Sequence, residues 1–234
     1  MDKDGHIIQK REKVIPLAKE IIQQVLEPNP WDFGNQVLYD MCQKAPLHVN
    51  EDEIIGKVWL IGRSYAAAIE RGAKDAKEKG DLFYVDAVAK KIKDVGVELD
   101  GRIASLRSEP KVSEDLLGEI VETHHFLTKV FYEISGKENR SLASKYLHFH
   151  VPNLFYIYDT RATFAVAKWV RHEKLEHPAK ELKKMLLLRH SDITYTDFVA
   201  KMYSLNVYLY EKYDVWLSPR KMDGLLLDYT LEGV

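Results

Sequence analysis

The stretch 50–71, NEDEIIGKVWLIGRSYAAAIER, carries the pattern that decides the fold class. Asn50 stands three residues ahead of Glu53, which is the arrangement of a capping box at a helix start. The apolar residues that follow recur at helical steps and line one face: Ile54, Ile55, Val58, Trp59, Tyr65 and Ala66. The stretch therefore predicts one helix that runs from this cap to about Arg71.

The same helical spacing continues on both sides of this stretch. The helices that it predicts cover approximately 16–26, 31–44, 81–95, 113–136, 139–150, 160–175, 178–190, 195–213 and 218–229. Strand-like residues such as those of 155–158 are too scattered for a sheet, and the glycine-bounded, charged stretch 72–80 is typical of a solvated turn or helix end. The prediction is an all-α, multi-helix globular protein with one domain over 1–234, which divides into two interleaved helical lobes at 1–110 and 111–234.

The composition argues against some classes of function. Hydrophobic residues make up 46% and charged residues 30% of the chain, and the formal net charge is −2, whereas a non-specific DNA-coating protein is usually basic. The single cysteine, Cys42, is predicted to be a buried thiol in a reducing compartment. No signal-peptide pattern opens the sequence and no apolar run is long enough to cross a bilayer. These features predict a cytoplasmic protein without a membrane partner.

The segment 141–162, SLASKYLHFHVPNLFYIYDTRA, holds the densest set of chemically useful side chains. Its first part reads as a short helix, Pro152 and Asn153 turn the chain, and Asp159 precedes a new helix that begins near Arg161. Aspartate is a preferred N-cap residue, so Asp159 is expected to cap this helix. A purely structural role for Asp159 stays open as an interpretation.

This layout, a helix followed by a proline turn, an aromatic run, an aspartate and a new helix, resembles the end of the active-site motif in helix-hairpin-helix DNA glycosylases. The resemblance lies within 136–162. It implies that Asp159 is the catalytic carboxylate and that DNA is a partner. The residues implied for the substrate pocket are His148, His150, Phe155, Tyr156 and Tyr158, and those implied for DNA phosphate contacts are Arg140, Lys145 and Arg161.

The segment departs from the glycosylase pattern in two ways. The stretch 136–141 has one glycine where the family has a glycine-rich hairpin, and Arg140 or Ser141 stands where bifunctional members carry a nucleophilic lysine. The resemblance therefore implies a monofunctional enzyme. Such an enzyme uses a carboxylate to stabilise the positive charge that develops on the sugar as the base leaves.

Other groupings of residues predict neither a metal site nor a cofactor. His148 and His150 are two residues apart and diverge on a helix, and no metal-binding motif accompanies them or His124 and His125. Arg63 and Tyr65 form an edge that either faces the cleft of Asp159 or belongs to a packed helix with solvated arginines. Two alternatives to the glycosylase function remain: a non-catalytic helical module that binds a protein or nucleic acid, and a small-molecule hydrolase.

Overall fold

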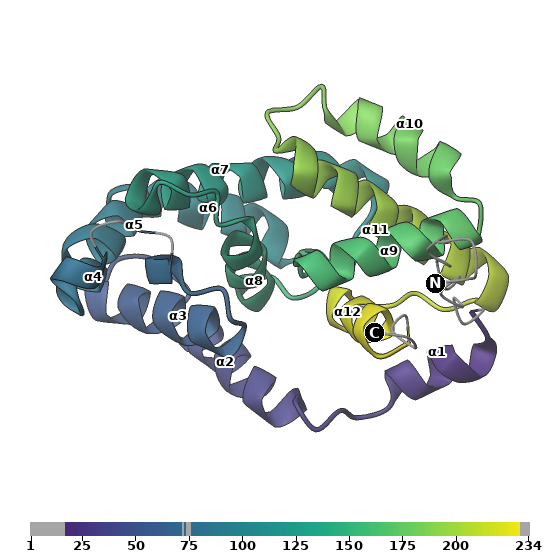
Figure 1. Cartoon of the computed structure of the whole chain (residues 1–234), viewed down its shortest axis with the longest axis horizontal. Coiled ribbons are helices and arrows are strands. Elements are labelled where there is room, and N and C mark those ends of the chain that lie inside the picture. The colour runs from purple at the N-terminus through teal and green to yellow at the C-terminus, as the bar shows by residue number, and fades with distance from the viewer. Residues whose placement is uncertain (1–16, 72, 74–75, 230–234) are drawn as a thin grey trace, which may run out of the picture.

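In the computed structural model, residues 17–71, 73 and 76–229 are described, and over them the chain forms twelve α-helices and no strand (Figure 1). The predicted all-α fold is confirmed. The helices are α1 (Lys19–Leu26), α2 (Asp32–Lys44), α3 (Glu51–Ser64), α4 (Ala76–Lys79), α5 (Lys90–Asp94), α6 (Gly96–Arg107), α7 (Leu117–Ser135), α8 (Arg140–His150), α9 (Thr160–His172), α10 (Glu176–Leu186), α11 (Ile193–Tyr213) and α12 (Pro219–Tyr229). Shorter turns of helix are η1 (Ile69–Arg71), the π-helix η2 (Tyr84–Ala89) and η3 (Glu114–Leu116).

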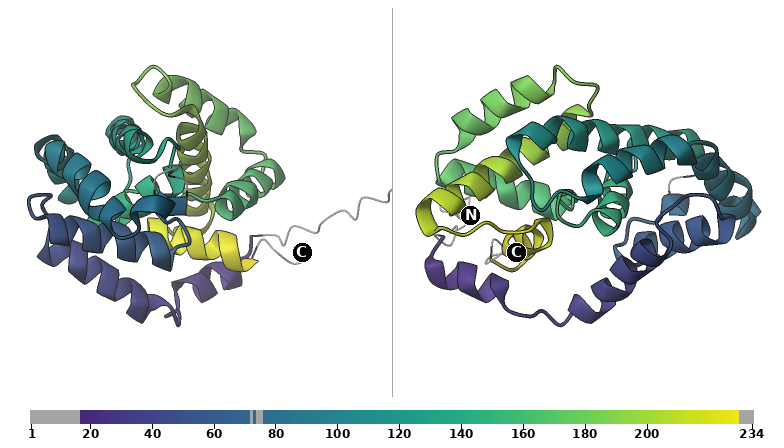
Figure 2. Two further views of the ribbon diagram at one scale, coloured as in Figure 1. Left: turned by 60° about the vertical axis from the view of Figure 1, so that its left-hand side comes forward. Right: turned by 180° about the vertical axis from the view of Figure 1, so that it is seen from behind.

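Helix α8 lies in the middle of the molecule, where the other elements surround it (Figures 1 and 2). Its side chains are buried without interruption from Leu142 to His150, and it packs against α2, α3, α6 and α7. A surface helix buries one stripe of side chains, whereas a helix buried all round must satisfy its polar groups internally. The buried polar residues of α8, among them Lys145 and His148, therefore need partners inside the protein.

The two ends of the described chain meet on one side of α8. Helix α9 packs against α11 and α12, and α1 packs against α12. The Tyr213 hydroxyl donates a hydrogen bond of 2.5 Å to the carbonyl of Leu17, which ties the C-terminal part of α11 to the residues before α1. Helices α2 to α6 occupy the opposite end, as Figure 1 shows. Residues 1–16 and 230–234 lie outside the described residues, and Pro16, at the start of the predicted helix 16–26, is among them.

The predicted helix over 50–71 is wrong at its C-terminal end. Helix α3 stops at Ser64, and Ala66 adopts the left-handed conformation with a φ of 52°. The chain can turn back here because Gly62 has no side chain: a Cβ on Gly62 would lie 3.1 Å from the Cα of Ala68. The capping-box prediction is also wrong, since Asn50 makes no side-chain cap hydrogen bond.

Helix α6 was not predicted, although Leu99, Ile103 and Leu106 are fully or almost fully buried at helical spacing. Gly96 begins α6 where the chain passes close to His48, because a Cβ on Gly96 would lie 2.8 Å from the carbonyl oxygen of His48. The stretch 72–80 is only partly described, and its described part includes α4. No helix among the described residues is long and apolar enough to cross a membrane.

The predicted helix ends at Gly136, Asp159 and Pro219 are confirmed. Gly136 ends α7 with a φ of 73°, which suits glycine at the residue after a helix. Asp159 caps α9. Pro219 begins α12, where the Lys221 N–H donates to the Ser218 hydroxyl at 3.3 Å. The cap of α11 is Asp192, which accepts hydrogen bonds from the N–H groups of Thr194 and Tyr195.

Candidate active site

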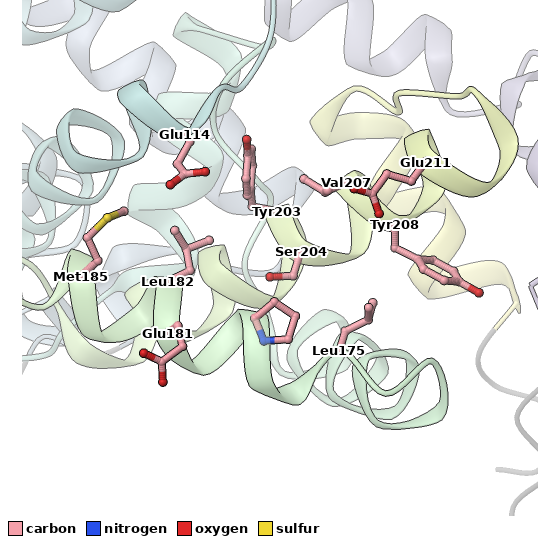
Figure 3. A pocket seen from close by; sticks show the side chains of 11 residues that line it. Glu114, Leu175, Glu181, Leu182, Met185, Tyr203, Ser204, Val207, Tyr208 and Glu211 are labelled. Carbon is pink, nitrogen blue, oxygen red and sulfur yellow. The ribbon is translucent and has the colours of Figure 1, made fainter.

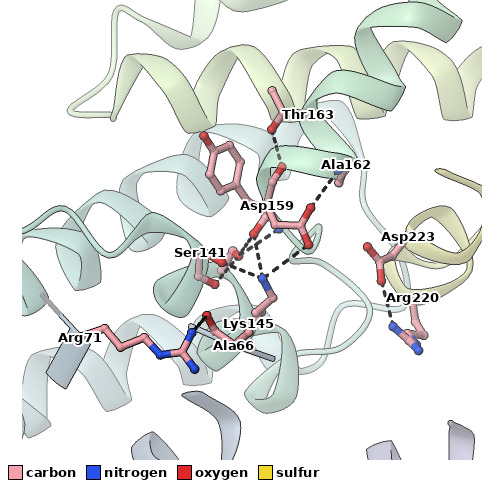
Figure 4. Close-up of polar contacts among 11 residues, drawn as sticks. Ala66, Arg71, Ser141, Lys145, Asp159, Ala162, Thr163, Arg220 and Asp223 are labelled. Carbon is pink, nitrogen blue, oxygen red and sulfur yellow. Dashed lines mark hydrogen bonds and ion pairs between the residues drawn. The ribbon is translucent and has the colours of Figure 1, made fainter. Parts of the chain in front are cut away.

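The candidate site is centred on the buried ammonium of Lys145, in the middle of α8 (Figure 4). Its Nζ donates to the Ser141 hydroxyl at 2.7 Å and to the Tyr158 carbonyl at 3.1 Å, and it lies 3.7 Å from Asp159 Oδ2. Its side chain is 2% exposed. Burial lowers the pKa of the Lys145 amine, and the carboxylates of Asp159 and Asp223 oppose this effect. The three acceptors match the three N–H donors of an ammonium.

Asp159 is held from two directions at the N-terminus of α9. Its Oδ1 accepts a hydrogen bond of 2.8 Å from the Ala162 N–H, and its Oδ2 faces Lys145. The Thr163 hydroxyl also donates to the Asp159 carbonyl at 2.7 Å. The side chain of Asp159 is nevertheless 31% exposed. The carboxylate is therefore fixed in position and still open to solvent.

Helix α12 adds a second carboxyl group, that of Asp223, beside Asp159 (Figure 4). Asp223 Oδ2 accepts from Arg220 Nη1 at 2.9 Å, while Oδ1 is buried and has no hydrogen-bond partner among the described residues. Burial raises the pKa of Asp223 to about 7; the positive charges of Arg220 and Lys145 lower it, and Asp159 raises it further. A carboxyl group that titrates near neutral pH can give or accept a proton at physiological pH.

Residues from the N-terminal half cover the other side of Lys145. The ring of Tyr65 lies 5.7 Å from Lys145 Nζ in a cation–π contact, and its hydroxyl donates to Asn35 Oδ1 at 2.6 Å. Burial raises the pKa of Tyr65 to about 12. Tyr65 therefore lies at this site, as one of the two interpretations of the Arg63–Tyr65 edge predicts. Arg63 is instead paired with Glu70 at 2.5 Å.

His148 supports this site from within the core and is not exposed to a ligand. It is fully buried, and its Nδ1 donates to the Phe155 carbonyl at 2.9 Å while its Nε2 accepts from the Tyr39 hydroxyl at 2.7 Å. Burial lowers the pKa of His148 to about 3, so the ring is neutral. Its place in a substrate pocket is not supported, because both of its ring nitrogens are used by the protein.

The aromatic residues before Asp159 have different positions. Phe155 and Tyr156 are fully buried and belong to the hydrophobic core, so neither ring is available to stack on a base. Tyr158 is half-buried and packs edge-on against Phe198, with ring centroids 5.3 Å apart. Of the three aromatic residues predicted to line the pocket, only Tyr158 reaches solvent next to Asp159.

The three residues predicted to contact DNA phosphates also lie in different environments. Arg161 is exposed on the first turn of α9. Arg140 binds Asp192 through its Nε, 2.8 Å from each carboxylate oxygen, and also pairs with Glu138. Lys145 is too deeply buried to meet a phosphate. Only Arg161 keeps the exposure that a DNA backbone contact requires.

A separate groove of about 450 Å³ lies between α10 and α11 (Figure 3). Its floor is apolar, formed by residues such as Leu182 and Val207, and the carboxylates of Glu114 and Glu211 lie near its edges. It shares no residue with the Lys145 site. The described residues contain no group of three or more histidine, cysteine, aspartate or glutamate side chains that could hold a metal ion.

Asp223 is not among the candidate residues that the sequence indicates. Asp223 lies within the last helix, and only its burial beside Arg220 distinguishes it from other helical aspartates. Comparison of the chain with family models, with curated proteins and with solved structures gives no significant match. The class of protein is therefore argued from the site alone.

Proposed function

We propose that this protein removes a base from DNA by hydrolysis of the N-glycosidic bond, with Asp159 as the catalytic carboxylate. One observation carries the proposal: the Asp159 carboxylate is fixed by the Ala162 N–H and faces Lys145, yet its side chain is 31% exposed. A carboxylate that serves only as a cap needs the first of these contacts alone. A buried ammonium beside it and partial exposure are features of a prepared catalytic group.

The chemistry needs a fixed negative charge and a group that handles a proton. As the bond to the base breaks, the sugar acquires positive charge, which a carboxylate held in place stabilises without reorganisation. The attacking water must also lose a proton. In this proposal the exposed Asp159 carboxylate orients this water and accepts that proton, which then passes to the departing base. Two neighbouring carboxyl groups are a common arrangement for hydrolysis of glycosidic bonds.

DNA binding would have to use a local basic surface, because the whole chain has a net charge of −2. Arg161 is exposed one turn from Asp159, and Tyr158 is half-buried beside it. Lys221 is near the start of α12 and donates to the carbonyl groups of Leu26 and Glu27, at 3.2 and 2.8 Å. Arg161 is the natural phosphate contact and Tyr158 the natural ring to stack on an extruded base.

The first test compares binding to two matched duplexes at low salt, one intact and one with a stable abasic-site analogue. The second is single-turnover excision from a panel of duplexes that each carry one damaged or deaminated base. Excision that falls about a hundredfold or more in Asp159→Asn supports the proposal. Asp86→Asn is the matched control, since Asp86 is exposed and pairs only with Lys90 at the surface. Equal binding to both duplexes together with no excision by the unmodified protein contradicts it.

A second candidate function is a non-catalytic helical module that binds a protein or nucleic-acid partner. The N-cap hydrogen bond of Asp159 favours it, because this bond accounts for an aspartate at the start of α9 without any catalysis. In that case Asp159→Asn would leave partner binding intact. The same variant therefore separates the two candidates.

A further inference from the structure

A second cavity, of about 280 Å³, lies at the end of α8, next to α2 and the last residue of α6. Its lining consists of Tyr39, Cys42, Gln43, Arg107, Phe149, His150 and Pro152. It shares no residue with the cluster of Lys145, Asp159 and Asp223. Because ligand pockets usually span roughly 300–1,000 Å³, this cavity suits a compact molecule.

The side chain that singles out this cavity is His150. It is buried, at 5% exposure, and neither ring nitrogen has a hydrogen-bond partner among the described residues. A neutral imidazole has one donor and one acceptor, and leaving both unsatisfied in the interior costs free energy. The neighbouring histidine, His48, differs: its Nδ1 pairs with Asp100 at 2.5 Å and its Nε2 with the Tyr146 hydroxyl at 2.7 Å. His150 therefore lines the cavity with a ring that has no hydrogen-bond partner among the described residues.

Two cationic side chains, Lys57 and Arg107, lie near His150. Burial lowers the pKa of His150 well below its usual value, and Lys57, His48 and Arg107 lower it further. Lys57 is occupied, since its Nζ donates to the carbonyl groups of Ala45 and Leu47 at 2.9 Å each. Arg107 is exposed at the mouth of the cavity, where its guanidinium can meet an entering group. Asp100 is the acidic side chain nearby, and it is paired with His48.

The positive charge of Arg107 favours an anionic ligand, and the other lining residues indicate which kind of anion fits the cavity. Phe149 and Cys42 are buried apolar walls, and Pro152 is an exposed apolar edge. A phosphate dianion is strongly hydrated and gains little from such walls. A carboxylate on a small apolar body suits both the guanidinium of Arg107 and the apolar walls. The guanidinium can bind the carboxylate in a bidentate arrangement, and the apolar body displaces water from the walls.

We propose that this cavity is a binding site for a small carboxylate with an apolar body, which Arg107 recognises at the mouth and His150 hydrogen-bonds at the floor. The site is distinct from the one assigned to Asp159. It takes a compact aromatic or short aliphatic acid.

The test measures binding of benzoate, phenylacetate and hexanoate by calorimetry, with benzamide as the neutral counterpart of benzoate. At least one acid is expected to bind with one-to-one stoichiometry, and benzamide to bind about tenfold more weakly than benzoate if benzoate binds. Arg107→Gln should weaken acid binding by roughly tenfold or more. Arg102→Gln is the matched control, because Arg102 lies on the same helix and pairs with Glu98. Since Arg107 is exposed, its replacement spares the fold.

Two further readouts locate the bound acid. His150→Phe removes both ring nitrogens and should abolish binding, and its melting temperature reports whether the variant is folded. The ring-nitrogen resonances of His150 should shift on titration with the acid, which reports on the site without a mutation. If no acid in the panel binds, or if Arg107→Gln binds as well as the unmodified chain, the cavity holds only water and the proposal is overturned.

Discussion

Lys145 Nζ lies 3.7 Å from Asp159 Oδ2, although the two residues belong to different helices and are separated by a proline turn. The contact exists because the segment 151–158 folds back along α8, where the Ser144 hydroxyl accepts a hydrogen bond of 3.0 Å from the Tyr158 N–H. The same fold-back brings the Tyr158 carbonyl to Lys145 at 3.1 Å. The proposed catalytic carboxylate is therefore positioned by the buried lysine of the preceding helix.

Asp159→Asn and Asp159→Ala are expected to differ in stability and to agree in activity. Both variants lose the ion pair with Lys145, but asparagine keeps a side-chain oxygen for the Ala162 N–H, whereas alanine should cost about 1 kcal/mol more through loss of the cap. Both variants lack the carboxylate and should lose excision. Urea unfolding and the excision assay measure the two properties. A cap-only role predicts the same stability difference without any activity to lose.

Lys145→Met should destabilise the protein because it removes a buried ammonium that donates to two oxygen atoms and forms an ion pair with a third. The Ser141 hydroxyl, the Tyr158 carbonyl and Asp159 Oδ2 all face the Lys145 ammonium. Loss of a charged hydrogen-bond donor from the interior costs about 1–3 kcal/mol. Denaturant unfolding measures the loss, and Lys90→Met is the surface control, since Lys90 pairs only with exposed Asp86. Equal unfolding free energies for the two variants would show that Lys145 does not hold this site together.

Asp223→Asn should stabilise the protein at alkaline pH. The folded pKa of Asp223, raised by burial to about 7, lies above the unfolded value of roughly 3.9. A raised folded pKa gives stability that is fully present below the unfolded pKa and is lost as pH rises through 7, because a buried charge then forms. Asparagine removes that charge, and the gain at pH 8.5 is on the order of a few kcal/mol. Thermal melts from pH 5 to 9 test this, and a variant no more stable than the parent at pH 8.5 would contradict it.

Asp192→Ala should reduce stability most at neutral pH. Burial by itself raises the pKa of Asp192, but the Arg140 guanidinium and the Tyr195 N–H outweigh burial and hold this pKa below its usual value. A lowered folded pKa gives stability that is present above the unfolded value and is lost as pH falls through the folded one. Alanine also removes the cap of α11, so the total loss should be about 2 kcal/mol. Melts at pH 7 and pH 3 should show the difference between variant and parent shrink on acidification.

Ala66→Gly should raise stability by about 0.5 kcal/mol. Ala66 holds a left-handed φ of 52°, which costs an L-residue roughly 1–2 kcal/mol, and glycine recovers part of this at a cost in chain entropy. Ala67→Gly is the control and should lower stability by about 0.5–1 kcal/mol, because Ala67 is not among the residues with positive φ. Urea midpoints compare the two. A loss of stability in both variants would argue against strain at Ala66.

Local patterns in the sequence predicted most of the helices, because a helix depends on neighbours three and four residues away. A single residue marks each of two helix ends: Gly136 ends α7, and Asp159 caps the start of α9. The burial of Cys42, 1% exposed, also followed from its apolar surroundings. Helix α6 carries the same local signal, since Leu99, Ile103 and Leu106 recur at helical spacing and are buried.

Only the tertiary structure decided which residues of 141–162 share a site. Phe155 and Tyr156 are packed into the core, while Asp159 and Tyr158 keep partial exposure, and no local pattern separates these two fates. Asp223 and Tyr65 reach Lys145 from distant parts of the chain. Burial and charge pairing depend on contacts between residues far apart in sequence. Local patterns therefore account for an all-α chain with Asp159 at a helix start. Packing around α8 accounts for the buried ammonium beside Asp159 and for the unpartnered imidazole of His150.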